Sequence, residues 1–336
     1  MHKRILVVGA GFTGATIARE LAELGHHIDM IDIRDHWAGN AFDYTNEYGI
    51  RVHKYGPHLF HTNNEDVWNY LSNFTEWTPY KHKVKAMLSD GRLVTLPVNA
   101  ETKEIVGEEN VLDIFFRPYT LKMWGKTLDE LNPAIIDRVP IRDDMNELYF
   151  PKDKFQAMPT NGYTEMIYNM MNHPNIKFSC GTAFDKSMEA DYDHVFNSMP
   201  IDVYYDLQFG ELPYRSIKFE TQTIPVPKVF PTATTNFTHA GPHTRVTEWK
   251  NIPEHGTNPH FTTLTFETPC DYRDNNMERY YPVRDKDGIN GAKHKQYLDI
   301  PNEKTTFVGR CGWYAYIDMH QAVSAALATV KKYNNG

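Results

Sequence analysis

A short apolar run over residues 4–8 leads directly into the glycine pattern G-x-G-x-x-G at Gly9, Gly11 and Gly14. The run predicts a buried strand, and the alanine-rich pattern that follows, through Leu24, predicts a helix. In this pattern Gly9 permits a tight turn, Gly11 lets a pyrophosphate approach the backbone, and Gly14 allows close packing of helix on strand. The free N–H groups at the start of the helix then attract phosphate. The chain therefore begins like a dinucleotide-binding domain.

The next predicted strand, residues 28–31, ends at Asp32. A carboxylate at this distance from the glycines accepts hydrogen bonds from a ribose 2′-hydroxyl and disfavours a 2′-phosphate. A lone glycine pattern is weak evidence, because a glycine-rich turn can lack any ligand. Here strand, helix, second strand and terminal acid occur in order, and we expect an adenine dinucleotide.

The C-terminal part favours FAD over NAD as the ligand. Residues 305–310 predict a short strand that enters a Gly-Arg loop, and Asp318 begins a predicted helix that extends to about Tyr333. Many FAD proteins place such a strand, loop and helix N-terminus beneath the isoalloxazine ring, where the helix dipole stabilises negative charge on reduced flavin. The alternative, that this helix only packs on the sheet, stays open from the residues alone.

The pattern between these two parts predicts inserted domains. Residues 83–97 alternate around Asp90-Gly91, which predicts a β-hairpin with a type I′ turn. Residues 111–131 and 161–172 predict helices, and 215–285 predict antiparallel strands. We expect an α/β plus α+β protein in which a small helical domain and an antiparallel-sheet domain are inserted into a Rossmann-like FAD-binding domain. The expected bounds are 1–80, 181–213 and 300–336 for the FAD-binding domain, 98–148 for the helical domain, and 81–97, 149–180 and 214–299 for the antiparallel-sheet substrate domain.

Composition excludes several classes of partner. The formal net charge of −8 argues against nucleic acid or an anionic membrane as the main partner. Cys180, Cys270 and Cys311 have no C-x-x-C spacing, which indicates neither a zinc site nor a disulfide framework. No apolar run approaches transmembrane length, and no signal-peptide segment precedes the first strand. We expect a cytoplasmic protein.

Several residues are candidates for chemistry. His58 and His61 lie in a dense polar and aromatic stretch, residues 53–62. Two histidines in a Gly-Pro loop, with no carboxylate partner beside them, are weak evidence for a metal, and hydrogen-bonded loop histidines are the plainer interpretation. The aromatic residues from Phe115 to Trp124 form either a core stripe or a surface that stacks on a base.

Arginine suits a diphosphate because its planar fork donates two parallel hydrogen bonds. The candidates are Arg138, Arg245, Arg284 and Arg310, although each alone is more typical of a surface or salt-bridge residue. No Ser-His-Asp or Cys-His set and no paired carboxylates emerge from the spacing. A bound cofactor is therefore expected to carry the reaction.

Together these stretches resemble the UDP-galactopyranose mutase family over nearly the whole chain. The matching motifs include Gly9–Gly14, Asp32–His36 with Gly39-Asn40, Tyr55–Thr62, Tyr119–Gly125, Tyr149-Phe150, Thr244–Glu248, Tyr280–Arg284, Phe307–Arg310 and Tyr314–Met319.

The resemblance implies a flavin-dependent interconversion of UDP-galactopyranose and UDP-galactofuranose. In this family N5 of reduced FAD is the nucleophile at the anomeric carbon, and no net redox change occurs. A nucleotide sugar is then the expected partner. Three alternatives remain: an FAD amine oxidase or monooxygenase of similar fold, a mutase of another nucleotide sugar, and a flavin-binding scaffold without activity.

The resemblance also implies roles for individual residues. The cofactor-binding set is Gly9, Gly11, Phe12, Thr13, Gly14, Asp32, Ile33, Gly39, Asn40, His58, Arg310, Asp318 and Met319. The set around the uridine is Tyr119, Trp124, Tyr149, Phe150 and Asn236, and the set around the diphosphate is Arg138, Arg245, Tyr281, Tyr314 and Tyr316. The catalytic residues implied are His58, His61, Arg138 and Arg245.

The sequence departs from the family in two respects. Only fifteen residues separate Asn99 from Phe115, where bacterial mutases carry a longer helical insertion that forms their dimer. As helix, fifteen residues span only about 22 Å, so we expect a monomer or a dimer through another surface. Ala38 stands in place of a usual glycine, and Ala315 replaces a frequently basic residue. Both lie in motifs expected near the flavin or diphosphate, where they bear on the sugar and nucleotide accepted.

Overall fold

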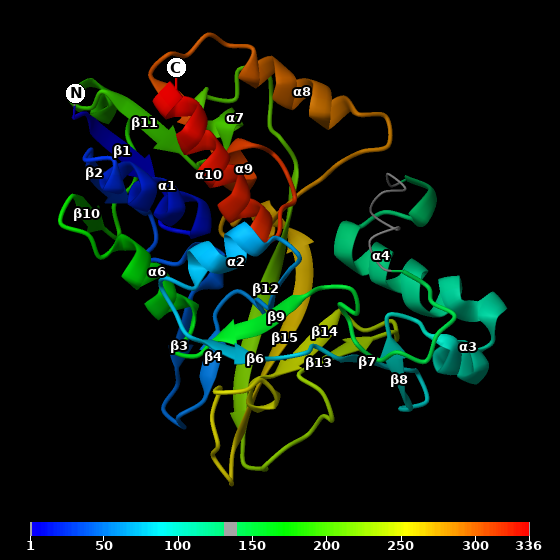
Figure 1. The fold of residues 1–336 in the computed structure, drawn as a ribbon. Coiled ribbons are helices and arrows are strands. Elements are labelled where there is room, and N and C mark those ends of the chain that lie inside the picture. Colours follow the sequence, from blue (N-terminus) through cyan, green and yellow to red (C-terminus); the bar gives the residue numbers. More distant parts are fainter. Residues whose placement is uncertain (1, 131–139, 336) are drawn as a thin grey trace.

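The computed structural model describes residues 2–130 and 140–335 of the chain. Its first element is the expected strand–helix–strand unit, which belongs to a five-stranded parallel sheet with the order β10-β2-β1-β11-β17 (Figure 1). The strands are β1 (Arg4–Val8), β2 (His27–Ile31), β10 (Ile176–Ser179), β11 (His194–Asn197) and β17 (Thr305–Phe307). Strands from both ends of the chain lie in one sheet, so this domain is discontinuous in sequence, as expected.

Helix α1 (Phe12–Glu23) is the centre of the main core. It packs against α10 (Met319–Asn335) and α6 (Tyr163–Met171). Its small residues Ala15 and Ala18 are fully buried, and Val323 and Ala326 of α10 are fully buried as well. Small side chains let helix axes approach closely, so the apolar stripe expected on the last helix is used to cover the nucleotide sheet.

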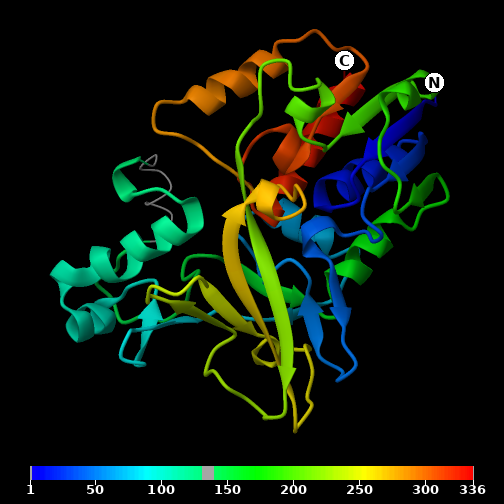
Figure 2. The same cartoon turned by 180° about the vertical axis from the view of Figure 1, so that it is seen from behind.

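A second, seven-stranded sheet has the order β16-β12-β15-β14-β13-β7-β8. Its members are β7 (Val84–Met87), β8 (Leu93–Leu96), β12 (Tyr214–Ile224), β13 (Thr234–Phe237), β14 (Arg245–Glu248), β15 (Thr262–Asp271) and β16 (Tyr281–Pro282). The long paired strands β12 and β15 are conspicuous in Figure 2. The pairing is antiparallel as expected, except that β13 runs parallel to β7.

Smaller elements complete the fold. A three-stranded sheet has the order β5-β9-β6, and β3 pairs with β4. These strands are β3 (Asp43–Thr45), β4 (Arg51–His53), β5 (Phe60–Thr62), β6 (Trp77–Pro79) and β9 (Phe155–Pro159). Within the described residues the remaining α-helices are α2 (Glu65–Leu71), α3 (Ala100–Val106), α4 (Arg117–Trp124), α7 (Ile201–Tyr204), α8 (Ile289–Leu298) and α9 (Gly309–Gly312).

Two expectations about local structure and domain bounds need correction. The sequence predicted that residues 149–180 belong to the antiparallel-sheet domain. Residues 163–179 instead form α6 and β10, and β10 pairs in parallel with β2 of the nucleotide sheet. The hairpin turn at Asp90-Gly91 is not type I′, because only Gly91 has a positive φ (87°). The Gly91 N–H donates to the Leu88 carbonyl, as in a type I turn followed by a glycine in the left-handed region.

The helical region is as short as the sequence indicates. The described part consists of α3, a π-helical turn over Leu112–Phe116, and α4, together with short 3₁₀ turns. Pro118 occupies the first turn of α4, and Gly125 ends that helix in the left-handed conformation. In Figure 1 this region lies beside the β7–β8 end of the seven-stranded sheet.

Helix α6 receives its N-terminal cap from a distant residue. Asp43 is buried, and its two carboxylate oxygens accept hydrogen bonds from the N–H groups of Tyr163 and Thr164, each at 2.9 Å. Gly162 precedes them at φ 91°, and a Cβ there would lie 2.4 Å from the Asp43 carboxylate. The cap therefore fixes α6 against β3, and with it one wall of the nucleotide domain.

We expect Asp43→Ala to destabilise the protein by about 1–2 kcal/mol or more, because the substitution leaves two helix N–H groups buried without an acceptor. Chemical denaturation measures the change in the free energy of unfolding. Glu47→Ala, which removes an exposed carboxylate from the adjoining loop, is the matched control. Equal stability of both variants would contradict the capping role.

Candidate functional site

The glycine loop has the geometry that the sequence predicts. Gly9 has φ 102°, and a Cβ there would lie 2.0 Å from Ser198 Oγ. A Cβ on Gly14 would lie 1.8 Å from the Gly9 carbonyl oxygen, so α1 can pass this close to β1 only with glycine at that position. The N-terminus of α1 has no side-chain cap at Gly11 and no acidic residue in its first turn. Its positive end is thus available to an anion.

Asp32 lies at the carboxyl end of β2, beside this loop. Its Oδ2 accepts a hydrogen bond from the Ala10 N–H at 2.8 Å, and its Oδ1 accepts one from the Arg34 N–H at 2.9 Å. Each oxygen keeps a second lone pair for a ligand hydroxyl. The neighbouring Ile33 leaves 74% of its surface exposed, which is unusual for an isoleucine and provides an apolar surface next to the carboxylate.

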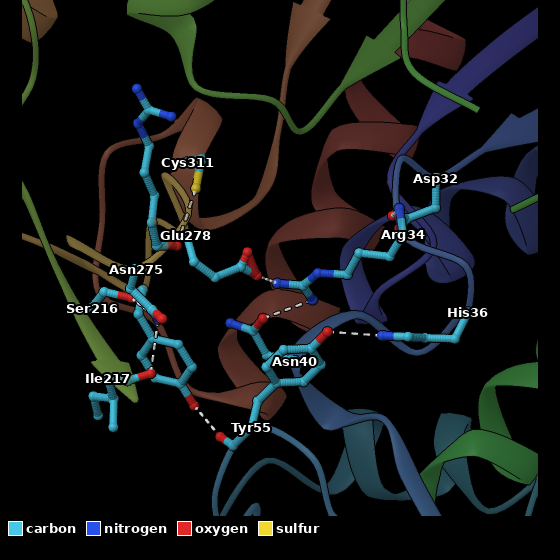
Figure 3. Close-up of polar contacts among 12 residues, drawn as sticks. Asp32, Arg34, His36, Asn40, Tyr55, Ser216, Ile217, Asn275, Glu278 and Cys311 are labelled. Atoms are coloured by element: carbon cyan, nitrogen blue, oxygen red, sulfur yellow. Dashed lines mark hydrogen bonds and ion pairs between the residues drawn. The ribbon is translucent and has the colours of Figure 1, made fainter. Parts of the chain in front are cut away.

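Arg34 joins this loop to the far part of the chain (Figure 3). Its guanidinium forms an ion pair with Glu278, donates from Nη1 to Asn40 Oδ1 at 2.9 Å, and lies 4.3 Å from the centre of the Tyr55 ring. The Tyr55 hydroxyl is 2.8 Å from His36 Nε2. Sequence analysis assigned no role to Arg34. The available signal was its place two residues after Asp32.

A second cationic centre is formed by Arg310 at the start of α9. Its Nη1 donates to the Tyr280 carbonyl at 3.1 Å, and its Nη2 donates to the Ile317 carbonyl at 3.0 Å. The guanidinium lies 5.6 Å from the Tyr281 ring and 5.2 Å from the Tyr316 ring. These two rings stack with centroids 5.1 Å apart. Two predicted diphosphate residues therefore lie beside a predicted flavin residue.

Arg245 lies on β14, in the middle of the seven-stranded sheet. Its Nε is 2.8 Å from Oε2 of Glu267, a carboxylate that is only 1% exposed. Glu267 holds one edge of the guanidinium, which leaves the terminal nitrogens for a ligand. Burial raises the pKa of the nearby Tyr119 to about 12, although Arg245 opposes this effect, so the hydroxyl stays protonated. Glu267 was not predicted from the sequence, where its only signal was a charged residue within a threonine-rich strand.

Asn236 lies directly opposite Arg245 across the β13–β14 pair. Within the described residues its Oδ1 atom is buried and has no hydrogen-bond partner. A buried amide oxygen without a donor costs free energy, and such groups mark positions where a ligand or water completes the hydrogen bonding. Asn236 is thus well placed to accept from a bound molecule beside the arginine.

His53 and His58 of the 53–62 stretch form a neutral group with His255. The side chains of His53 and His255 are buried, with their Nε2 atoms 3.0 Å apart. His53 Nδ1 accepts from the His58 N–H at 3.1 Å, and His255 Nδ1 donates to the Pro253 carbonyl at 2.8 Å. Burial, helped by Arg310 and Arg245, lowers the pKa of His58 to about 4. His58 is therefore uncharged at neutral pH.

His61 differs from these residues because it has a carboxylate partner. Its Nδ1 is 2.6 Å from Asp153 Oδ2, and its ring stacks on Phe150 with centroids 3.5 Å apart. Phe150 makes an edge contact with Tyr149, and both lie near the buried His82. Sequence analysis found no carboxylate beside His61, because Asp153 is ninety-two residues away in the chain.

The structure brings most of the predicted substrate residues close to one another. Trp124 lies 6.3 Å from Tyr281 between ring centroids, and Tyr119, Tyr149 and Arg245 interact electrostatically. Tyr314 is the exception. It is 1% exposed, and its hydroxyl donates to the Val283 carbonyl at 2.7 Å, so the structure turns this hydroxyl into the core and away from the other residues of the expected diphosphate set.

The remaining predicted residues are quickly placed. Asp318 and Met319 lie at the start of α10, where the Asp318 N–H donates to Gln321 Oε1. Arg138 lies outside the described residues. Among residues 2–130 and 140–335, no group of three histidine, cysteine or carboxylate side chains is arranged to hold a metal ion. The same residues include no helix that is long and apolar enough to span a membrane.

Comparison with known proteins identifies similar chains. The family described as UDP-galactopyranose mutase matches residues 114–316, and an NAD(P)-binding Rossmann-like domain matches residues 7–74. A probable UDP-galactopyranose mutase of Klebsiella pneumoniae is 34% identical, and the match covers 99% of this chain and 95% of that protein. A dTDP-fucopyranose mutase of Escherichia coli is also 34% identical, with 98% of each chain covered.

Solved structures agree on the fold. A reduced UDP-galactopyranose mutase has a TM-score of 0.76 at 16% identity, with 100% of this chain and 94% of that chain covered. A putrescine oxidase bound to putrescine has a TM-score of 0.58 at 12% identity, with both chains covered in full. The expected fold class, a Rossmann-like domain combined with further mixed sheets and helices, is confirmed.

We expect the stability of the protein to fall as the pH drops from about 6.5 toward about 4. Burial lowers the pKa of His255 from 6.5 to about 4, so in this window the unfolded chain binds a proton that the folded chain does not. This one histidine accounts for a loss of up to about 3 kcal/mol. Denaturation at several pH values measures it.

His255→Gln should flatten this pH dependence, because the substituted side chain does not titrate. His260→Gln, at an exposed position nearby, is the control and should leave the slope unchanged. An identical acid dependence in the wild-type protein and His255→Gln would contradict the assignment of a neutral buried His255.

Proposed function

This chain belongs to the UDP-galactopyranose mutase family, and on that premise we propose that it interconverts UDP-galactopyranose and UDP-galactofuranose. The observation that carries the proposal is the convergence of Arg245, Arg310, Tyr281 and Tyr316. Arg310 follows Gly309, and a Cβ on Gly309 would lie 3.7 Å from Thr13 Oγ1 at the start of α1. Two cations among tyrosines in a chain of net charge −8 suit the diphosphate of a nucleotide sugar.

We further propose FAD as the cofactor, active in its reduced form. The cradle left by Gly9 and Gly14, the uncapped α1 N-terminus and the Asp32 carboxylate fit the pyrophosphate and ribose of such a dinucleotide. When bound and reduced, the flavin would supply the nucleophile for the anomeric carbon. Ile33 would pack on the adenine, and Asn40, Arg310 and Asp318 would lie along the rest of the cofactor.

The protein side chains would then bind and orient the substrate. Arg245, fixed by Glu267, would donate its terminal N–H groups to the diphosphate and stabilise the charge that develops on the nucleotide as the glycosidic bond breaks. Tyr281 and Tyr316 would donate hydroxyl hydrogen bonds to the same group. Asn236 Oδ1 would accept a hydrogen bond from the substrate, and Tyr119, Trp124, Tyr149 and Phe150 would enclose the base.

A second substrate is supported by one of the relatives. The Escherichia coli protein named dTDP-fucopyranose mutase is as similar to this chain as the Klebsiella pneumoniae protein is. dTDP-fucose differs from UDP-galactose in three places: it lacks the 6-hydroxyl group of the sugar, lacks the 2′-hydroxyl group of the ribose, and carries thymine in place of uracil. Which of the two substrates the protein prefers therefore depends on which groups of the nucleotide sugar form hydrogen bonds with polar side chains such as Asn236.

We expect the purified protein to be yellow, or to become so with FAD, and to lose that colour with dithionite. Reduced protein incubated with UDP-galactofuranose should give UDP-galactopyranose, with no reductant consumed in proportion to turnover. Chromatography separates the two sugars, and dTDP-fucopyranose assayed in parallel decides the substrate. Oxygen or NAD(P)H use that matches turnover would instead indicate an oxidase, and a protein that binds no FAD would refute the cofactor.

We expect Arg245→Lys to lower kcat/KM by about 10²- to 10³-fold, which corresponds to about 2.7–4 kcal/mol of lost transition-state stabilisation. Lysine keeps a positive charge near the buried Glu267 but lacks the planar fork. Steady-state kinetics measures the loss, and flavin absorbance and thermal melting should stay normal. Arg92→Lys, on the exposed hairpin tip, is the control. Normal turnover, or turnover lost only together with flavin, would contradict this role.

We also propose that the protein does not form the usual dimer of bacterial mutases. The match with the Klebsiella pneumoniae relative extends over 371 residues, more than the 336 of this chain, so that protein has residues without a counterpart here. The described helical region contains only the short helices α3 and α4 with intervening turns. Light scattering on the size-exclusion peak determines the mass, and a dimer that uses residues 100–130 would contradict the proposal.

A further inference from the structure

The pairing of His61 with Asp153 is more tightly built than a chance surface contact. His61 lies in β5, where its register partner on β9 is Gln156. The Gln156 amide donates to the carbonyls of Phe150 at 2.8 Å and Asp153 at 3.0 Å. The strand opposite His61 therefore fixes the short loop that carries both the ring stacked on His61 and the carboxylate at its Nδ1 atom.

The carboxylate itself is held from a second direction. Asp153 Oδ1 accepts a hydrogen bond from Asn63 Nδ2 at 2.9 Å, while Oδ2 lies 2.6 Å from His61 Nδ1. The Lys154 N–H in turn donates to Asn63 Oδ1 at 2.8 Å. Each oxygen of Asp153 has a defined partner, so the carboxylate cannot rotate without breaking a charge-assisted hydrogen bond.

The imidazole is confined on its other sides as well. Its ring lies nearly parallel to Phe150, at 11°, and His320 from α10 approaches it edge-on with centroids 5.8 Å apart. The His320 side chain also hydrogen-bonds to the His61 backbone. Parallel stacking restricts the tilt of the ring, and the Asp153 contact restricts its rotation about χ2. His61 is thereby limited to one orientation.

This pair lies between the aromatic residues of the proposed substrate site and a solvent-exposed cleft. On one side the Phe150 ring leads to Tyr149 and Tyr119, which belong to the proposed substrate site. On the other side a cleft of about 540 Å³, lined by Asp153, His320, Gln321 and Ser324 among others, is open to solvent. Asp153 therefore has one oxygen 2.6 Å from His61 Nδ1 and also lines a cleft that is open to solvent.

We propose that Asp153 is a positioning residue of the candidate active site: it holds His61 with Nδ1 protonated and Nε2 as a hydrogen-bond acceptor, in one fixed orientation. This inference rests on the proposed function for the step that His61 serves. The physical reason is that a carboxylate which binds one nitrogen of a neutral imidazole determines which nitrogen carries the proton. The ring can then present only a lone pair, and not an N–H group, to a bound ligand.

The test compares Asp153→Asn with Asp153→Glu in the full, flavin-loaded chain. Long-range ¹H–¹⁵N correlation of the histidine side chains reports the tautomer of each ring, and His61→Gln assigns the His61 signals. We expect one Nδ1–H tautomer in the wild-type protein, a mixture or the opposite tautomer in Asp153→Asn, and recovery in Asp153→Glu. Lys154→Gln is the matched control, because Lys154 pairs with Glu65 on the exposed surface and should leave the signals unchanged.

Kinetics separates positioning from a merely structural role. We expect Asp153→Asn to lower kcat on the order of 10²-fold while KM changes by less than about threefold and flavin content stays normal, because a small misplacement of an active-site group has effects of this size. Unchanged His61 signals in Asp153→Asn would overturn the proposal. Wild-type kcat, or a loss of kcat that follows a loss of flavin or of melting temperature, would overturn it too.

The outcome is distinguishable from a failure of the proposed function. If the wild-type protein converts neither nucleotide sugar, the proposed function fails. The positioning role of Asp153 is then tested by the same tautomer measurement, with UDP added as the probe. A UDP-induced shift of the His61 signals in the wild-type protein that is lost in Asp153→Asn supports the positioning role, and the absence of any such shift in the wild-type protein overturns it.

Discussion

The contact between Gly14 and the Gly9 carbonyl is the constraint on which the rest of the molecule depends. A Cβ at Gly14 would lie 1.8 Å from that oxygen, so α1 and β1 can approach this closely only without a side chain there. The close approach directs the N-terminal N–H groups of α1 across the carboxyl ends of β1 and β2, where Asp32 lies. It also sets the position of α1, against which α6 and α10 pack. Displacement of α1 would therefore disturb the proposed cofactor site and the main core together.

The second organising feature is the way in which cations are held in the interior. Glu267 is almost fully buried and pairs with Arg245, while Arg310 donates to two backbone carbonyls among tyrosine rings. A half-buried arginine without such partners would be costly, and these contacts hold each guanidinium in one orientation. A molecule with an overall negative charge thus keeps a localised positive region beside its nucleotide domain. Such a region would attract the proposed diphosphate without making the whole surface attractive to nucleic acid.

The histidines show how burial divides one residue type into two roles. His53, His58 and His255 are desolvated and hydrogen-bonded as neutral rings, which ties the 53–62 stretch to the loop around Pro253. His61 lies only three residues after His58 and has a carboxylate partner, Asp153, instead. The first group makes the fold sensitive to acid, whereas the second gives the proposed site a ring with a defined donor and acceptor. Sequence spacing alone, H-x-x-H, does not distinguish these environments.

The sequence by itself determined the nucleotide domain and the family. The glycine pattern, Asp32 and the final helix are local features whose backbone requirements can be read residue by residue, and the predicted hairpin and last helix follow from periodicity in the same way. Tertiary structure decided the rest. Strand β10 joins the parallel sheet because β2 offers it an edge, Tyr314 turns into the core, and Asp153 reaches His61 across ninety-two residues. These outcomes depend on which distant segments pack together. The periodicity of a sequence indicates which side chains of a segment are buried, but it does not indicate which other segment covers them.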